Sequence, residues 1–151
     1  MIEMTKKMNN RPISEIQDEI VEEFEFLGEW PDKYEHLMNI GKALPRLPEA
    51  AYSEENKVKG CQSNLWMITR TENGNIIFEG DSDALLVKGL VGLLLKVFSN
   101  HTPEEILEAN LDFLGKIGLQ AHLSATRNNG LEAMIKQIKF YALAYKAKMT
   151  A

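Results

Sequence analysis

The sequence has very little of the chemistry that builds metal sites or disulfides. Its 151 residues contain one cysteine, Cys61, and three histidines that are far apart along the chain. One cysteine cannot form an intramolecular disulfide or a CxxC redox pair. With so few thiols and imidazoles, the chain cannot by itself assemble a closed Cys/His zinc site or a four-thiolate iron–sulfur site. Any sulfur chemistry therefore depends on a single thiol.

Long apolar runs and an excess of basic charge are also missing. The longest uncharged apolar run, Gly89 to Leu95, is far shorter than the roughly 20 residues of a membrane-spanning helix. The polar start, Met1 to Pro12, lacks the apolar centre of a secretory signal, so we expect a cytoplasmic protein with no membrane partner. Acidic residues (22) outnumber basic residues (17), which gives a net charge of −5 and argues against a nucleic-acid partner.

What is present is the composition of an ordinary globular domain, with 44% hydrophobic and 26% charged residues. Helical periodicity starts at Ser14, a potential cap with Gln17 at the capping-box spacing, and predicts a helix that ends at Gly28. A second helix is expected from about Asp32 to Pro45, where the proline stops it.

The middle of the chain has the pattern of strands. Two apolar runs, residues 65–71 and 76–78, flank an Asn73-Gly74 pair that is typical of a tight hairpin turn. The stretch 57–59 could add a third strand, which would place Cys61 on a tight connection at the rim of the sheet. We therefore predict an α+β fold in which a small antiparallel sheet of about three strands is packed by helices.

The second half is expected to be mostly helical. A long apolar helix should follow the acidic stretch 81–83, which could cap it and whose last residue is Asp83. Residues 115–130 are rich in turn formers, and helical spacing resumes at Leu131 and continues to the end. No linker divides the chain, so we predict a single domain over 14–149 after a flexible N-terminus of residues 1–13.

Cys61 lies in polar, basic and glycine-containing surroundings that differ from those of a core cysteine. Lys57 and Lys59 would favour the thiolate, which is the nucleophilic form, and Gly60 gives the backbone freedom to present it. These residues leave two interpretations open, a reactive thiol and an inert cysteine that ends a strand. A Cys-His hydrolase would require the fold to bring a histidine close, because such pairs are neighbours in space and not in sequence.

The run NKVKGCQSNLW, residues 56–66, resembles the cysteine motif of the SufE proteins, the sulfur acceptors of cysteine desulfurases in iron–sulfur cluster assembly. The resemblance covers about residues 14–148. Further matches follow in the same order along the chain, and they include Gly80-Asp81-Ser82-Asp83-Ala84, Thr102-Pro103, His122-Leu123-Ser124, Arg127 and Gly130-Leu131. One departure is Ala125-Thr126, where many relatives have Pro-Ser, and it concerns the stiffness of a loop.

The resemblance implies a fold similar to that of the IscU-type scaffold proteins and a loop cysteine that accepts a persulfide sulfur. Cys61 is then the catalytic residue, and the residues implied to form the loop and to bind the partner are Lys57, Lys59, Gly60, Gln62, Ser63, Asp83 and Arg127. The implied partners are a SufS-like cysteine desulfurase and a SufBCD-like iron–sulfur scaffold complex. We expect no cofactor or metal in this chain, because pyridoxal phosphate would belong to the desulfurase.

Arg127 and Asp83 each have a structural interpretation beside the chemical one. The guanidinium could brace the cysteine loop, stabilise the thiolate or persulfide, or cap the preceding chain. The Asp83 carboxylate could cap the long helix or lie close to the cysteine loop.

Two alternative functions remain open. The protein could be a non-catalytic allosteric module of a desulfurase in which Cys61 is incidental, or it could carry sulfur to another pathway such as tRNA thiolation. Whether it counts as an enzyme is left open by the sequence. A scaffold must hold iron with several cysteines, so the single thiol favours a carrier. Because persulfides are reactive, a loop that shelters the sulfur and swings out on docking, with Gly60 as hinge, is a reasonable expectation.

Overall fold

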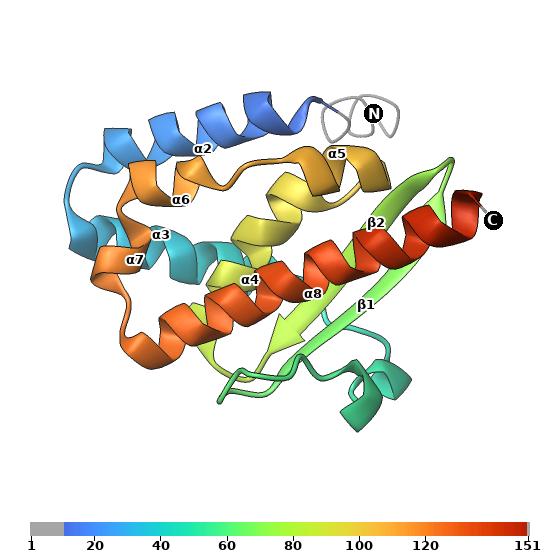
Figure 1. The fold of residues 1–151 in the computed structure, drawn as a ribbon. Coiled ribbons are helices and arrows are strands. Elements are labelled where there is room, and N and C mark those ends of the chain that lie inside the picture. The colour runs from blue at the N-terminus through green and yellow to red at the C-terminus, as the bar shows by residue number, and fades with distance from the viewer. Residues whose placement is uncertain (1–10, 151) are drawn as a thin grey trace.

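The computed structural model describes residues 11–150 and has a two-stranded antiparallel sheet with helices around it (Figure 1). The elements in chain order are α2 (Ile13–Leu27), α3 (Trp30–Ala43), the 3-10 turns η1 (Glu49–Ala51) and η2 (Glu54–Asn56), β1 (Leu65–Glu72), β2 (Asn75–Ser82), α4 (Leu85–Phe98), α5 (Pro103–Glu108), α6 (Asp112–Ile117), α7 (Leu119–His122) and α8 (Ala125–Thr150). The expected α+β fold is confirmed. None of the helices in this range is both long and apolar enough to cross a membrane.

Helix α4 lies at the centre of the domain. It contacts β2, α3, α2 and α8, and ten of its residues are buried. Its sequence, LLVKGLVGLLLKVF, is apolar on nearly every side, which is the pattern of a helix covered all round. The long α8 crosses the hairpin on one side, while α2, α5 and α6 lie along another edge of the domain (Figure 1). Strand β2 and the helices α2, α3 and α8 are therefore positioned against α4.

Glycines bring α3 and α4 into backbone contact. A Cβ atom added to Gly89 would lie 2.2 Å from the carbonyl oxygen of Leu37, and one added to Gly41 would lie 2.8 Å from the backbone nitrogen of Gly89. No side chain fits between atoms at these separations. The crossing of the two helices consequently depends on glycine at both positions.

The predicted hairpin is present, but the sheet has two strands and not three. Strand β1 pairs with β2 from Leu65↔Ser82 to Glu72↔Asn75, and the turn residues Asn73 and Gly74 both have positive φ. The expected third strand is reduced to a bridge between Lys57 and Trp66 and a 2.8 Å bond from the Val58 N–H to the Leu65 carbonyl. It goes no further because the chain turns away at Gly60, where φ is +92°.

Several helix boundaries differ from the predicted ones. Helix α2 begins at Ile13 after Pro12, so Ser14 is inside the helix and does not cap it. Helix α3 begins at Trp30, slightly earlier than expected. The N-cap of α4 is Ala84, so the acidic stretch 81–83 does not cap this helix. Residues 115–130, expected as turns, contain α6, α7 and the first turns of α8.

We expected a flexible N-terminus over residues 1–13. Residues 1–10 of this segment lie outside the described residues. The remaining part is tied to the domain. The Arg11 carbonyl accepts a 2.6 Å hydrogen bond from His101 Nε2, and Ile13 is buried. The structure thus places residues 11–13 with the domain, while the assignment for residues 1–10 stays a prediction.

Candidate functional site

Cys61 lies on a short loop, residues 59–63, which we call the cysteine loop. The loop is beside the first turns of α8, on the edge of the molecule that also carries η1 and η2 (Figure 1). Within the described residues, the hydrogen bonds that fix this segment are at its two ends. At its start the Val58 N–H donates to the Leu65 carbonyl at 2.8 Å, so the chain leaves and rejoins the sheet at one place.

The other end of the cysteine loop is fixed at Asn64. The Asn64 backbone N–H donates to Asp83 Oδ1 at 3.2 Å, and its side-chain amide donates to Asp83 Oδ2 at 2.7 Å. Ser82 Oγ donates to the Asn64 carbonyl at 2.8 Å. Of the two interpretations of Asp83, the contacts agree with the second: its carboxylate binds the end of the cysteine loop and does not cap α4. We call these bonds at Asn64, together with the Val58–Leu65 bond, the stem of the cysteine loop.

A buried carboxylate lies next to this stem. Asp81 is 5% exposed and accepts hydrogen bonds from Tyr52 Oη at 2.5 Å and from the Ser82 N–H at 2.8 Å, with Lys88 Nζ at 3.3 Å. Burial opposes ionisation of Asp81, but these donors outweigh it and hold the pKa of Asp81 below its usual value. Burial and the neighbouring carboxylate in turn raise the pKa of Tyr52. The pair ties the segment around η1 to the end of β2.

The thiol of Cys61 is half-buried between α4 and α8. It lines a small cavity of about 10 Å³ together with Val87, Leu90, Gly130 and Met134. That volume is close to the least that holds one water molecule. A Cβ atom added to Gly130 would lie 3.2 Å from Cys61 Sγ, so the sulfur sits against the backbone of α8. The structure thus places the thiol inward, with apolar side chains of α4 and α8 at some lining positions of the cavity and polar side chains at others.

The other predicted site residues are distributed around this cavity. Gln62, Ser63 and Arg127 line it with Cys61, whereas neither lysine does. The Lys57 ammonium is 2.8 Å from Glu54 Oε1. Lys59 and Gly60 are exposed. The structure therefore brings Arg127 to the cavity of the cysteine, while the two lysines are not among the residues that line it.

Arg127 owes its position to the start of α8. Ser124 Oγ accepts a 3.2 Å hydrogen bond from the Arg127 N–H, the arrangement of a serine N-cap with the third helical residue. Ser124 was the sequence signal for this helix start, and sequence reasoning missed it. The cavity residues Val87, Leu90, Gly130 and Met134 were missed as well, since they come from two helices far from Cys61 in sequence.

The three histidines have other partners. His36 Nε2 is 2.8 Å from Glu23 Oε1, His101 contacts backbone carbonyls, and His122 stacks on Trp30 with 3.9 Å between ring centroids. None of them lines the cavity of Cys61. Among residues 11–150, no group of three or more His, Cys, Asp or Glu side chains is placed to hold a metal ion. A Cys-His pair is not formed here.

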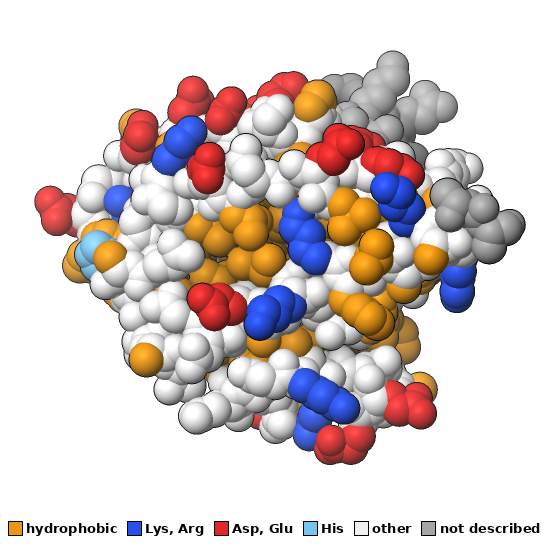
Figure 2. Space-filling model, in the orientation of Figure 1, with side chains coloured by type: hydrophobic (Ala, Val, Ile, Leu, Met, Phe, Trp, Pro, Cys, Tyr) orange, Lys and Arg blue, Asp and Glu red, His pale blue; other side chains and the backbone are white. Residues whose placement is uncertain are grey.

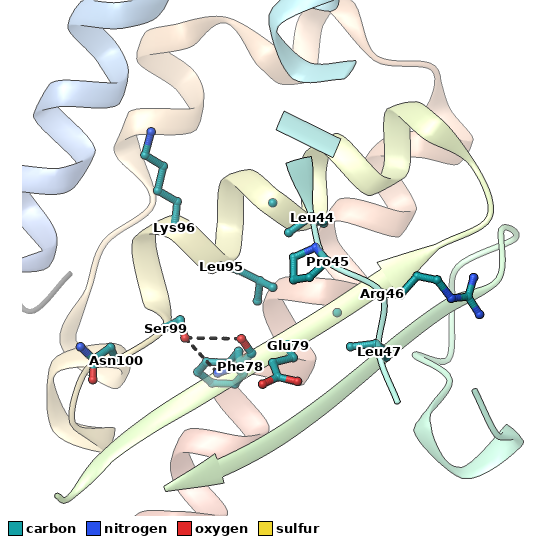
Figure 3. A pocket seen from close by; sticks show the side chains of 12 residues that line it. Leu44, Pro45, Arg46, Leu47, Phe78, Glu79, Leu95, Lys96, Ser99 and Asn100 are labelled. Atoms are coloured by element: carbon teal, nitrogen blue, oxygen red, sulfur yellow. Dashed lines mark hydrogen bonds between the residues drawn. The ribbon is translucent and has the colours of Figure 1, made fainter. Parts of the chain in front are cut away.

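A larger cavity of about 300 Å³ lies elsewhere, between the segment 44–47, the edge of β2 and the last turns of α4 (Figure 3). Its walls include Pro45, Leu95 and Phe78, and the Phe78 backbone N–H donates to Ser99 Oγ at 3.0 Å. Arg46 and Lys96 point away from the cavity. It contains none of the predicted site residues.

Figure 2 shows that acidic side chains gather along the edge formed by α2 and α5. Apolar side chains are grouped near the middle of the same face, with several basic side chains beside them.

Comparison with known proteins identifies the domain. A family model for SufE, described as an Fe-S metabolism associated domain, matches residues 18–142. The chain belongs to the SufE family. The match includes the cysteine loop, its Asn64 stem and the α8 residues that border the thiol.

Two relatives and one solved structure agree with this assignment. An uncharacterized SufE-like protein of Rhizobium meliloti is 46% identical over 127 residues, which is 81% of this chain and 91% of the relative. An uncharacterized SufE-like protein of Rhizobium etli is 43% identical over 127 residues, or 81% and 86% of the two chains. The solution structure of a hypothetical protein from Thermus thermophilus shares the fold, with a TM-score of 0.72 at 22% identity over 87% of this chain and 96% of that one.

Proposed function

We propose that this SufE-family protein accepts sulfur from a cysteine desulfurase onto Cys61 and passes it to iron–sulfur cluster assembly. The observation that carries the proposal is the position of the chain's one cysteine, on a loop with a fixed stem between two helices of a SufE domain. Several cysteines would be needed to hold a cluster, whereas one is enough to carry a sulfur atom.

The transfer step is a thiol exchange. The Cys61 thiolate attacks the outer sulfur of the desulfurase cysteine persulfide, and a new S–S bond forms at Cys61 Sγ as the S–S bond in the donor breaks. The donor cysteine leaves as a thiolate. The transferred sulfur becomes the outer sulfur of a Cys61 persulfide, which either keeps its proton (–S–SH) or loses it to solvent (–S–S⁻). No net oxidation or reduction occurs, because one S–S bond replaces another. Pyridoxal phosphate belongs to the desulfurase, so this chain requires no cofactor of its own.

The thiol must leave its inward position to reach the donor. The stem bonds at Val58 and Asn64 stay in place while the cysteine loop turns about Gly60. Gly60 can act as the hinge because glycine adopts its φ of +92° and negative values of φ about equally readily. Exposed groups around the loop, namely Lys59, Gln62 and Asp83, then contact a SufS-like desulfurase. A SufBCD-like scaffold complex takes the sulfur in the next step. We place this work in the cytoplasm, where reducing conditions keep a lone thiol free.

Mass spectrometry after incubation with desulfurase and cysteine tests the proposal. The wild type should gain about 32 mass units per sulfur atom at Cys61, as thiol exchange requires. Cys61→Ser should fold normally and gain no sulfur, because a hydroxyl does not replace the thiolate in this reaction. Equal sulfur gain in both proteins would refute the assignment of Cys61. If Cys61→Ser gained no sulfur but stimulated cysteine turnover as well as the wild type, the protein would be an allosteric module.

A further inference from the structure

Gly130 is an unusual residue for its place in the fold. It lies in the second turn of α8, a helix of 26 residues, and it is buried. Glycine within a helix is less favourable than alanine, so this position gives up helix stability. Gly115, in α6, is also helical, but a Cβ added there would meet nothing within 4 Å. Alanine substitutions at the two glycines therefore distinguish the effect of alanine on helix stability from the effect of a new methyl group on a neighbouring atom.

The local contact at Gly130 is with the thiol. The atom nearest to a Cβ added at Gly130 is Cys61 Sγ, at 3.2 Å, which is closer than carbon and sulfur normally approach. One turn further, a Cβ added at Gly60 would lie 3.4 Å from the Cβ of Ala133. The cysteine loop is thus laid directly on a part of α8 where the side chains are small or absent.

The cavity around the thiol is small, and its lining combines residues of α4 and α8 with Gln62 and Ser63 of the cysteine loop. Val87 and Leu90 of α4 and Met134 of α8 close the cavity, whose remaining volume is about 10 Å³. Interiors packed to this density respond to an added methyl group by displacing the least restrained neighbour. Here the least restrained neighbour is the tip of the cysteine loop, because the hydrogen bonds at Val58 and Asn64 hold only its ends.

We propose that Gly130 is a positioning residue that seats the Cys61 thiol in the free protein, and that the missing side chain at this position sets the balance between the seated and the released cysteine loop. In the seated state the sulfur is closed in by α4 and α8. In the released state it can meet a reagent or a partner. The link to desulfurase docking rests on the proposed function, whereas the seat itself does not.

The first test is the alkylation rate of Cys61 in the folded protein without a partner. Gly130→Ala should raise this rate about tenfold, which corresponds to about 1.4 kcal/mol in the seated-to-released balance. Its melting temperature should stay equal or rise, because alanine favours the helix. Gly115→Ala, the matched control, should leave the rate unchanged. Rates of the unfolded proteins in denaturant serve as the reference for a fully accessible thiol.

A second variant distinguishes the seat from a general disturbance of α8. Val87→Ala removes two methyl groups from the opposite wall of the cavity, so in the double variant with Gly130→Ala the sulfur has room to remain seated. The double variant should return toward the wild-type alkylation rate. An alkylation rate for Gly130→Ala within twofold of the wild type would overturn the proposal, and so would a double variant faster than Gly130→Ala alone.

Desulfurase stimulation provides a separate measurement. If docking uses the released loop, Gly130→Ala should lower the half-saturating concentration of this protein by about the alkylation factor and leave the maximal rate unchanged, as for any protein whose competent state becomes more populated. Faster alkylation with no change in half-saturation would support the seat and count against the proposed docking. Unchanged alkylation would refute the seat whatever the desulfurase does.

Discussion

Removing the Tyr52 hydroxyl should destabilise the fold in a pH-dependent manner. Tyr52 Oη donates to buried Asp81 at 2.5 Å and accepts from the Leu47 N–H at 3.0 Å. Tyr52→Phe deletes a hydrogen bond to a charged group, worth about 1.5–3 kcal/mol, and leaves the N–H of buried Leu47 without its acceptor, at about 1 kcal/mol or more. We expect a total loss near 3 kcal/mol at pH 7, a large part of the 5–15 kcal/mol typical of a domain.

The sign of the pH dependence follows from the lowered pKa of Asp81. A carboxyl group with a lowered pKa in the folded state contributes stability above its unfolded pKa, near 3.9, and this contribution is lost as pH falls through the folded value. Tyr52→Phe moves the folded pKa upward and weakens that contribution. The loss caused by the variant should therefore be largest at pH 7 and shrink as the pH approaches about 3.

Urea unfolding of the wild type and Tyr52→Phe between pH 7 and pH 3 measures both quantities. Tyr145→Phe is a control of the same chemistry, because its hydroxyl forms a 2.8 Å hydrogen bond with the neutral Thr69 hydroxyl. Its effect should be small and independent of pH. A loss below about 1 kcal/mol for Tyr52→Phe, or a loss of constant size across this range, would refute the role given to the Tyr52–Asp81 bond.

Three further changes address the cysteine loop directly. Asp83→Ala removes two hydrogen bonds to Asn64 and should speed alkylation of Cys61 severalfold with a stability loss of about 1 kcal/mol, because the carboxylate is exposed; an unchanged rate would show that the stem does not restrain the thiol. Arg127→Ala should lower sulfur acceptance or the melting temperature, and if it lowers neither, both the chemical and the structural interpretation of this residue are wrong. Replacing Lys57 and Lys59 together by Glu should slow association with the desulfurase, most clearly at low ionic strength, since rim charges act on encounter rates. The matched control reverses the charges on the distant acidic face of α2, at Glu15, Asp18, Glu22 and Glu25. If this control abolished stimulation while the double lysine change had no effect, the docking surface would lie on α2.

Local chemistry made part of the fold predictable. The Asn73-Gly74 pair specifies a hairpin turn with positive φ at two successive residues, and the structure has that turn. The apolar surface of α4 indicated its central place for a similar reason. By contrast, the acidic stretch 81–83 looked like a helix cap, but its side chains bind Tyr52 and Asn64 from other segments. No local pattern specifies such long-range partners.

In the site, as in the fold, features set by neighbouring residues were predictable and features set by distant residues were not. The polar, glycine-containing run around Cys61 identified the loop and its thiol from neighbouring residues alone. The inward direction of the sulfur is set by Val87 and Gly130, which lie 26 and 69 positions further along the chain. In the structure the Lys57 ammonium pairs with Glu54 of η2, and the expected influence of the two lysines on the thiol stays a prediction. Spacing along the sequence does not show with which charged group a flexible lysine side chain forms an ion pair.

The contact between α3 and α4 makes the chain's tolerance of sequence change uneven. At Gly89 and Gly41 even a methyl group meets backbone atoms at 2.2 and 2.8 Å, and backbone cannot rotate away as a side chain can. A library of random variants should therefore lose folded members at these two positions about as readily as at the largest core residues, although glycine contributes no apolar surface there. Because α4 also forms one wall of the thiol cavity, a helix displaced at Gly89 would open that cavity from a distance, and the reactivity of Cys61 would report on packing at the opposite side of α4.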